Sequence, residues 1–104
     1  MSNDTILGAP YNIASYALLL MMYCEILGMT PMKVVHQVGD AHIYLNHLDQ
    51  IEEMLSRPCP PNPWVSFRED LPFGQYKDPV EFEWKDIVLE DYNPGEKMDF
   101  PIAK

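Results

Sequence analysis

The stretch LGAPYNIASYALLLMMYCEILG, residues 7–28, decides the fold because it holds the most apolar run of the chain. From Asn12 to Leu27 the only charged residue is Glu25, and Gly28 follows where helices commonly end in a left-handed residue. We therefore expect a helix over residues 12–27 that is apolar on nearly every side. The run is shorter than the roughly 18 residues that suggest a membrane-spanning helix and has no basic flank, so we expect no membrane span.

A helix of this kind needs to be covered on every side, which a chain of 104 residues can hardly do alone. Domains of about 100 residues bury only some 60–65% of the surface of the unfolded chain. We therefore expect a larger body or a partner chain to enclose this helix.

The residues after the apolar run alternate between strand and helix patterns. β-Branched residues on both sides of Gly39-Asp40 predict two short strands, or one broken strand, within residues 33–47. In an unbroken strand, His42 and Tyr44 would point to the same side. The segment from Leu48 to Arg57 has apolar residues at helical spacing and an acidic outer face, which predicts a surface helix.

The second half of the chain is expected to be mainly extended. Four prolines in residues 58–63 end the helix, and residues 64–70 alternate as a strand does. Residues 81–100 predict a further strand pair, with a turn at Asn93-Pro94-Gly95. We predict one domain over residues 1–104, of mixed α/β class, in which a mixed sheet packs against a buried apolar helix.

Charge and cysteine content narrow the function classes. Seven basic and sixteen acidic side chains give a net charge of −9, which disfavours DNA and anionic membranes as partners but leaves a small phosphorylated ligand possible. Cys24 and Cys59 lie far apart and fit no zinc-binding spacing. We expect reduced thiols, no metal site and a cytoplasmic location.

Two motifs go beyond pattern. LGAPYNIASYALL at residues 7–19 is similar to a G-x-P-[FY]-N-I-x-S-Y segment of the thymidylate synthase family, and GDAHIYLNH at 39–47 is similar to that family's G-D-x-H-x-Y-x-N-H segment. The second motif follows about thirty residues after the first in both cases, and a proline-rich segment and an Asp-Tyr-Asn-Pro sequence follow later. The chain therefore resembles the carboxy-terminal half of thymidylate synthase over essentially its whole length.

The resemblance implies a set of ligand-binding residues. Asn12 would pair with the base of dUMP, His42 and Tyr44 would bind the deoxyribose 3′-hydroxyl, and Ser2 would contribute to the phosphate site. An asparagine offers both a donor and an acceptor to a uracil edge, whereas an aspartate would suit the amino group of cytosine. For the cofactor 5,10-methylenetetrahydrofolate, the resemblance implies two further residues, which are Asp4 and Ala103.

The residues alone leave other roles open for these side chains. Asn12 precedes the apolar run at the position that a helix N-cap prefers. His42 and Tyr44 could form an ordinary half-buried strand pair. We assign no functional role to His36 and His47.

The chain departs from the family pattern at its two ends. Met1 stands where the family has a phosphate-binding arginine, so we expect poor phosphate affinity of this chain alone, and Lys104 follows the apolar tail. The family's cysteine nucleophile, in a Pro-Cys-His setting, has no counterpart here, and neither Cys24 nor Cys59 occupies such a setting. We therefore name no catalytic residue and expect an amino-terminal thymidylate synthase half, or self-association into a homodimer, as partner.

Joined to such a half, the chain would take part in the methylation of dUMP with 5,10-methylenetetrahydrofolate. The alternatives are a fragment of a dUMP hydroxymethylase and a non-catalytic module for nucleotide binding or oligomerisation.

Overall fold

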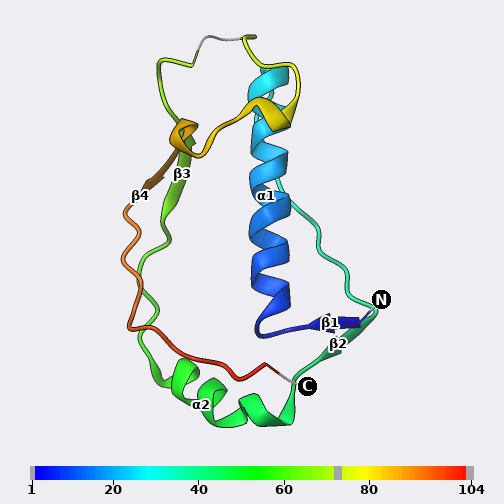
Figure 1. Ribbon diagram of the computed structural model, residues 1–104, viewed down its shortest axis with the longest axis vertical. Coiled ribbons are helices and arrows are strands. Elements are labelled where there is room, and N and C mark those ends of the chain that lie inside the picture. The colour runs from blue at the N-terminus through cyan, green and yellow to red at the C-terminus, as the bar shows by residue number, and fades with distance from the viewer. Residues whose placement is uncertain (1, 72–73, 103–104) are drawn as a thin grey trace.

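One long helix, α1 (Gly8–Leu27), runs along much of the long axis of the molecule and connects two clusters of short elements (Figure 1). The computed structural model describes residues 2–71 and 74–102. The other elements are β1 (Ser2–Asp4), β2 (Asp40–His42), α2 (Leu48–Ser56), β3 (Trp64–Phe67), β4 (Ile87–Glu90) and three 3-10 turns at Leu45–His47, Pro79–Glu81 and Trp84–Asp86.

The helix α1 begins four residues earlier than predicted and ends where predicted. The Asp4 carboxylate accepts hydrogen bonds from the amides of Ile6 (3.1 Å) and Leu7 (3.3 Å), and this turn starts the helix at Gly8. Gly28 ends it in the left-handed conformation, with φ 63° and ψ 35°. Asn12 therefore lies inside α1, and its possible role as the N-cap is wrong.

The strands form one parallel and one antiparallel pair. β1 pairs with β2 in parallel, so that Ser2 faces Asp40 and Asp4 faces His42. β3 pairs with β4 in the antiparallel sense. The mixed α/β class is confirmed, but among the described residues the two pairs remain separate sheets.

Two of the predicted strands are absent from the described part of the chain. Residues 33–39 are irregular, and Val34, Val35 and Val38 are exposed, because no neighbouring strand is present to pair with them. Within residues 81–100 the only strand is β4. The chain turns after it at Asp91, which has φ 54°, instead of at Asn93-Pro94-Gly95. The surface helix α2, in contrast, is confirmed and ends one residue early.

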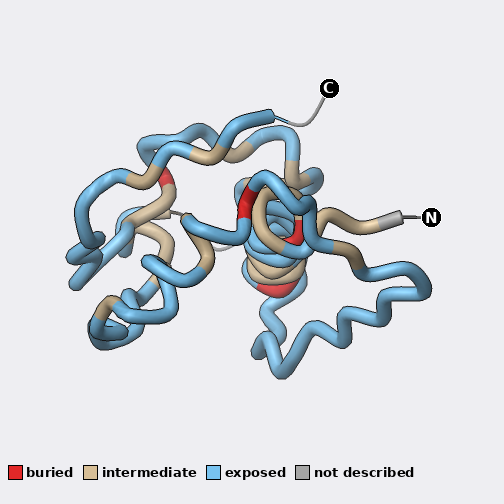
Figure 2. Tube along the Cα trace, turned by 90° about the horizontal axis from the view of Figure 1, so that it is seen from below, coloured by how far each residue is buried: buried red, intermediate tan, exposed pale blue. Residues whose placement is uncertain are grey.

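Very little of the described chain is buried (Figure 2). Only Ala9, Cys24, His47 and Asp86 are buried among the residues that the structure describes. The accessible surface is 8660 Å², whereas a compact protein of this mass exposes about 6,000 Å². The radius of gyration is 16.8 Å, against about 13 Å for a compact domain of this length.

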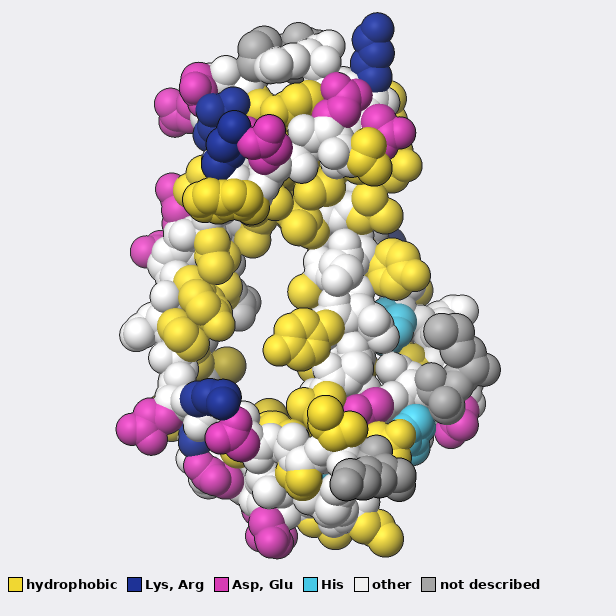
Figure 3. All heavy atoms as spheres, in the orientation of Figure 1, with side chains coloured by type: hydrophobic (Ala, Val, Ile, Leu, Met, Phe, Trp, Pro, Cys, Tyr) yellow, Lys and Arg dark blue, Asp and Glu magenta, His cyan; other side chains and the backbone are white. Residues whose placement is uncertain are grey.

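The helix α1 is therefore largely exposed instead of buried. It contacts β1 near its start and the turn Pro79–Glu81 near its end (Figure 1). Between these two ends, Figure 3 shows an opening through the molecule, bordered by hydrophobic side chains of α1 and of the opposite β3–β4 side. The chain cannot enclose its own helix, because its remaining residues are spread around this opening.

No helix in the described ranges combines the length and the apolarity needed to cross a membrane. Residues 2–71 and 74–102 also bring no three His, Cys, Asp or Glu side chains into an arrangement that could hold a metal ion.

Candidate functional site

His42 and Tyr44 lie side by side at the end of β2. Their rings meet edge to face, with centroids 5.1 Å apart and an interplanar angle of 84°. Tyr44 comes after β2 and precedes the turn Leu45–His47, so the two rings meet without the unbroken strand that the alternation predicted. The pair joins two hydrogen-bonding groups at one place, next to Asp4 on the neighbouring strand β1.

Asn12 lies in the second turn of α1 with its side chain exposed. It lines an open hollow of about 310 Å³ together with Asn3, Tyr16 and residues 36–39, the segment that leads into β2. The hollow is at the small end of the range for ligand pockets and is open to solvent. Asn12 thus shares this hollow with the segment that enters β2, whereas neither His42 nor Tyr44 lines it.

The remaining predicted residues are placed less fully. The backbone of Ser2 pairs with Asp40 in the β1–β2 sheet. The Oδ1 atom of Asp4 accepts the hydrogen bonds of the turn that starts α1. Gly8 lies close by, since a β-carbon added to it would be 3.4 Å from the β-carbon of Asp4. The two hydrogen bonds to Oδ1 and the strand register hold Asp4 between the helix start and His42. Ala103 lies outside the described residues.

His47 belongs to the same cluster as His42 and Tyr44, although we assigned it no functional role from the sequence. Its side chain is fully buried, and its Nε2–H donates a hydrogen bond to the carbonyl oxygen of Pro101 at 2.7 Å. The ring meets Tyr44 edge to face at 5.6 Å and Phe100 at 5.4 Å. The signal available in the sequence was its place in the motif GDAHIYLNH, three residues after Tyr44.

Comparison with known proteins identifies the family to which the chain belongs. The family model for thymidylate synthase matches residues 1–104. The chain belongs to the thymidylate synthase family. A solved structure that it resembles is a thermostable thymidylate synthase A from Bacillus subtilis, at 28% sequence identity and a TM-score of 0.83. The match covers 97% of this chain and 34% of that one, so the chain spans about a third of the length of its structural relative.

The opposite end of this thymidylate synthase-like chain is organised by Asp86, which is also fully buried. Its Oδ2 atom accepts hydrogen bonds from the Tyr76 hydroxyl and the Glu83 amide, both at 2.9 Å. Its Oδ1 atom lies 3.0 Å from Nε of Arg68 in an ion pair that lacks hydrogen-bond geometry. The Glu83 amide, with help from Tyr76 and Arg68, holds the pKa of Asp86 below its ordinary value despite desolvation. The hydrogen bond to Asp86 raises the pKa of Tyr76.

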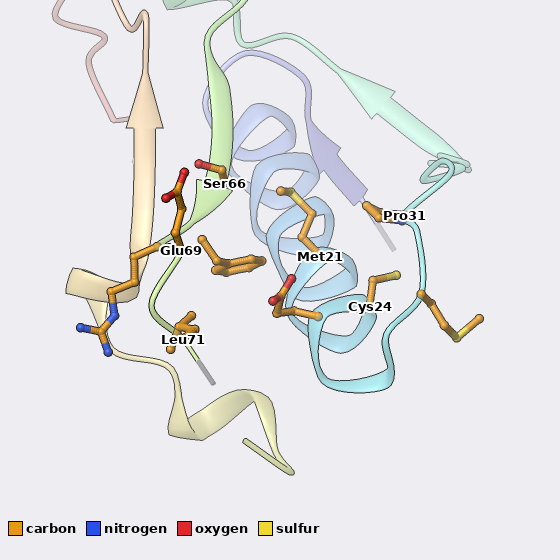
Figure 4. A pocket seen from close by; sticks show the side chains of 10 residues that line it. Met21, Cys24, Pro31, Ser66, Glu69 and Leu71 are labelled. Atoms are coloured by element: carbon orange, nitrogen blue, oxygen red, sulfur yellow. The ribbon is translucent and has the colours of Figure 1, made fainter. Parts of the chain in front are cut away.

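A second hollow, of about 390 Å³, lies at this end between α1 and the segment that begins in β3 (Figure 4). Met21 and Cys24 line it from the helix, while Phe67 and Arg68 line it from the other side. None of the predicted ligand-binding residues reaches it. We therefore place the candidate site at the β1–β2 end.

Proposed function

We propose that this chain is the nucleotide-holding part of a thymidylate synthase-type enzyme, and that polypeptide outside these residues supplies the cysteine nucleophile. The observation that carries the proposal is the contact between His42 and Tyr44 in a chain that belongs to this family. His42 lies opposite Asp4 of the neighbouring strand. The position of Asn12 adds support, because an exposed asparagine inside a helix does not cap that helix and leaves its amide free for a ligand.

In this proposal each residue contributes a different part of dUMP recognition. The amide of Asn12 donates and accepts one hydrogen bond each at the uracil edge, which distinguishes uracil from cytosine. His42 and Tyr44 bind the 3′-hydroxyl of the deoxyribose. Ser2, at the start of β1, contributes to the phosphate site.

The described residues hold and orient the nucleotide but provide no nucleophile for it. Cys24 is buried in α1, and Cys59 is exposed beside prolines, where its thiol contacts the carbonyl oxygen of Pro60 at 3.7 Å. When bound, 5,10-methylenetetrahydrofolate supplies both the one-carbon unit and the hydride for methylation. We propose that Asp4, held beside His42, faces this cofactor. Ala103, the other residue that the family resemblance implies, lies outside the described residues.

The exposed surface favours completion by further polypeptide. The accessible surface of 8660 Å² exceeds that of a compact protein by roughly 2,700 Å², which is more than a standard protein interface buries in total. We propose that the amino-terminal part of a thymidylate synthase covers α1 and borders the opening in Figure 3. Self-association into a homodimer is the competing way to cover the same surface.

Complementation tests the proposed function directly. The chain is combined with the amino-terminal part of a thymidylate synthase, and tritium release from dUMP labelled at C5 is measured in the presence of 5,10-methylenetetrahydrofolate. We expect release that depends on both parts. The matched control is the same partner with its cysteine replaced by serine, which removes the nucleophile. Failure of every complementing part to give release would contradict the proposal.

Base recognition is tested with the variant Asn12→Asp in the complemented protein. Loss of the amide donor should weaken dUMP binding by at least about tenfold and raise the affinity for dCMP, because a carboxylate accepts from the cytosine amino group. Asn93→Asp, at an exposed asparagine far from the site, is the control and should change neither affinity. Equal behaviour of the two variants would remove Asn12 from the base site.

Calorimetry with dUMP on the chain by itself separates an obligate part from an independent binding module. A dissociation constant below about 10 μM would favour the module. The open hollow beside Asn12 leads us to expect no binding at that concentration.

A further inference from the structure

His47 joins two segments that lie far apart in the sequence. Its Nε2–H donates to the carbonyl oxygen of Pro101 at 2.7 Å, a separation of 54 residues. The neighbouring contact, from Nδ2 of Asn46 to the same oxygen, is long at 3.5 Å and exposed. Residues 97–102 form no helix or strand. The hydrogen bond of His47 is therefore the main polar tie that holds this segment at the site.

The ring of His47 also closes a row of aromatic side chains. Tyr44 packs against one part of it at 5.6 Å and Phe100 against another at 5.4 Å, in both cases edge to face. Tyr44 in turn meets His42 at 5.1 Å. The row His42–Tyr44–His47–Phe100 thus runs from the proposed nucleotide-binding pair to the carboxy-terminal segment, and its only fully buried member is His47.

A purely space-filling role does not account for this residue. Among the described residues, the Nδ1 atom of His47 is buried without a hydrogen-bond partner, which is a cost that an apolar ring of similar size would avoid. The imidazole therefore adds its Nε2–H donor to the ring contacts. That donor fixes both the position of Pro101 and the orientation of the ring against which Tyr44 rests.

We infer that His47 is a positioning residue for the nucleotide site, which holds the Tyr44 ring in place by fixing the segment around Phe100 and Pro101. The inference rests on the proposed role of Tyr44 in binding dUMP. A site is effective when the side chains that touch its ligand are held by a supporting layer of contacts. His47 supplies that support without touching the ligand itself.

The test compares His47→Phe, which keeps an aromatic ring but removes the donor, with His47→Gln, whose amide can still donate to Pro101. Tyr92→Phe is the matched control, because it also keeps an aromatic ring and removes a donor, but at an exposed position after β4. Hydrogen exchange of the Met98, Asp99, Phe100 and Ile102 amides is followed in the chain, and kcat and KM for dUMP are measured in the complemented protein. Far-UV circular dichroism checks that each variant retains α1.

For His47→Phe we expect exchange of these amides to accelerate at least about tenfold and KM for dUMP to rise by a similar factor, with a smaller change in kcat. His47→Gln should restore most of both properties, and Tyr92→Phe should change neither.

Unchanged exchange in His47→Phe would overturn the tie to Pro101. Faster exchange with an unchanged KM would overturn the positioning role while leaving the proposed function intact. Lack of dUMP turnover in the unsubstituted complemented protein would instead overturn the proposed function, and the inference with it.

Discussion

The two ends of the molecule are each built around one fully buried polar side chain, and they differ in how completely that side chain is paired. On Asp86, Oδ2 accepts hydrogen bonds from Tyr76 and Glu83, while Oδ1 has no hydrogen bond among the described residues but lies 3.0 Å from Nε of Arg68 in an ion pair. His47 has one hydrogen bond, to Pro101, and in the described part of the chain its second ring nitrogen has none.

The partners also differ in their sequence separation. The Asp86 cluster draws its members from residues 68–86, so it can form locally. The His47 cluster joins residues 42–47 to residues 100–101, so it forms only when distant parts of the chain meet. The Asp86 cluster is therefore self-contained, whereas the His47 cluster ties together two distant segments of the chain.

The substitution Asp86→Asn should give the largest effect and break the structural end alone. It removes the charge opposite Arg68 and one acceptor, so we expect the melting temperature of the complemented protein to fall by roughly 5 °C. The control Asp70→Asn removes an exposed carboxylate that also pairs with Arg68, at 3.4 Å, and should have almost no effect. An equal fall in melting temperature in both variants would contradict this prediction, because the buried carboxylate of Asp86 would then contribute no more than the exposed one of Asp70.

The variant Tyr44→Phe should affect the other end and leave stability nearly unchanged. Loss of one hydroxyl that binds the ligand costs about 1 kcal/mol, or five- to tenfold in affinity for dUMP, measured by calorimetry on the complemented protein. Tyr92→Phe, at an exposed tyrosine after β4, is the control. A fall in melting temperature without a change in affinity would make Tyr44 structural and remove the contrast between the ends.

Acid should weaken the Asp86 end of the molecule. Because the pKa of Asp86 is lowered in the folded protein, its stabilising contribution is present above its ordinary value of 3.8 and is lost as the pH falls through the lower folded pKa. Acid titration followed by the fluorescence of the neighbouring Trp84 measures this loss. Asp86→Asn should remove that part of the pH dependence, and its persistence in the variant would assign the transition to other carboxylates.

The smallest effect is expected from Tyr76→Phe, which removes one of several contacts of Asp86. The pKa of Tyr76 is raised, so its contribution is complete below its ordinary value of 10.0 and is lost as the pH rises through the folded pKa. Thermal melts at pH 8 and pH 11 should therefore differ less for Tyr76→Phe than for the unsubstituted chain. A difference of the same size in both would exclude Tyr76 as the group responsible.

The sequence predicted those elements whose signals are local. The end of α1 at Gly28 follows from one residue, and α2 follows from helical spacing. The early start of α1 depended on the Asp4 turn, outside the apolar run that was used to predict it. The strand predicted around Val34 and Val35 did not form, because a strand needs a partner and residues 2–71 and 74–102 provide none beside this segment.

For the proposed site residues, the sequence likewise predicted only the contacts between residues that are close in the chain. The motif places His42 and Tyr44 two residues apart, and in the structure their rings are in contact, with Tyr44 lying just after the end of β2. The tie between His47 and Pro101 spans 54 residues and leaves no local pattern. Asp86 stands in a segment that alternates apolar and charged residues, and only the folded arrangement distinguishes its carboxylate from those exposed on either side.

The opening between α1 and the β3–β4 side has a consequence for assembly. Chain surrounds it, since α1 contacts the rest of the molecule at β1 and again at Pro79–Glu81. A segment that fills this ring enters through one of its faces or is already present when the ring closes. Refolding this chain together with the proposed complementing part should therefore yield more complex than mixing the two after each has folded. The yield would then depend on whether association comes before or after the ring closes.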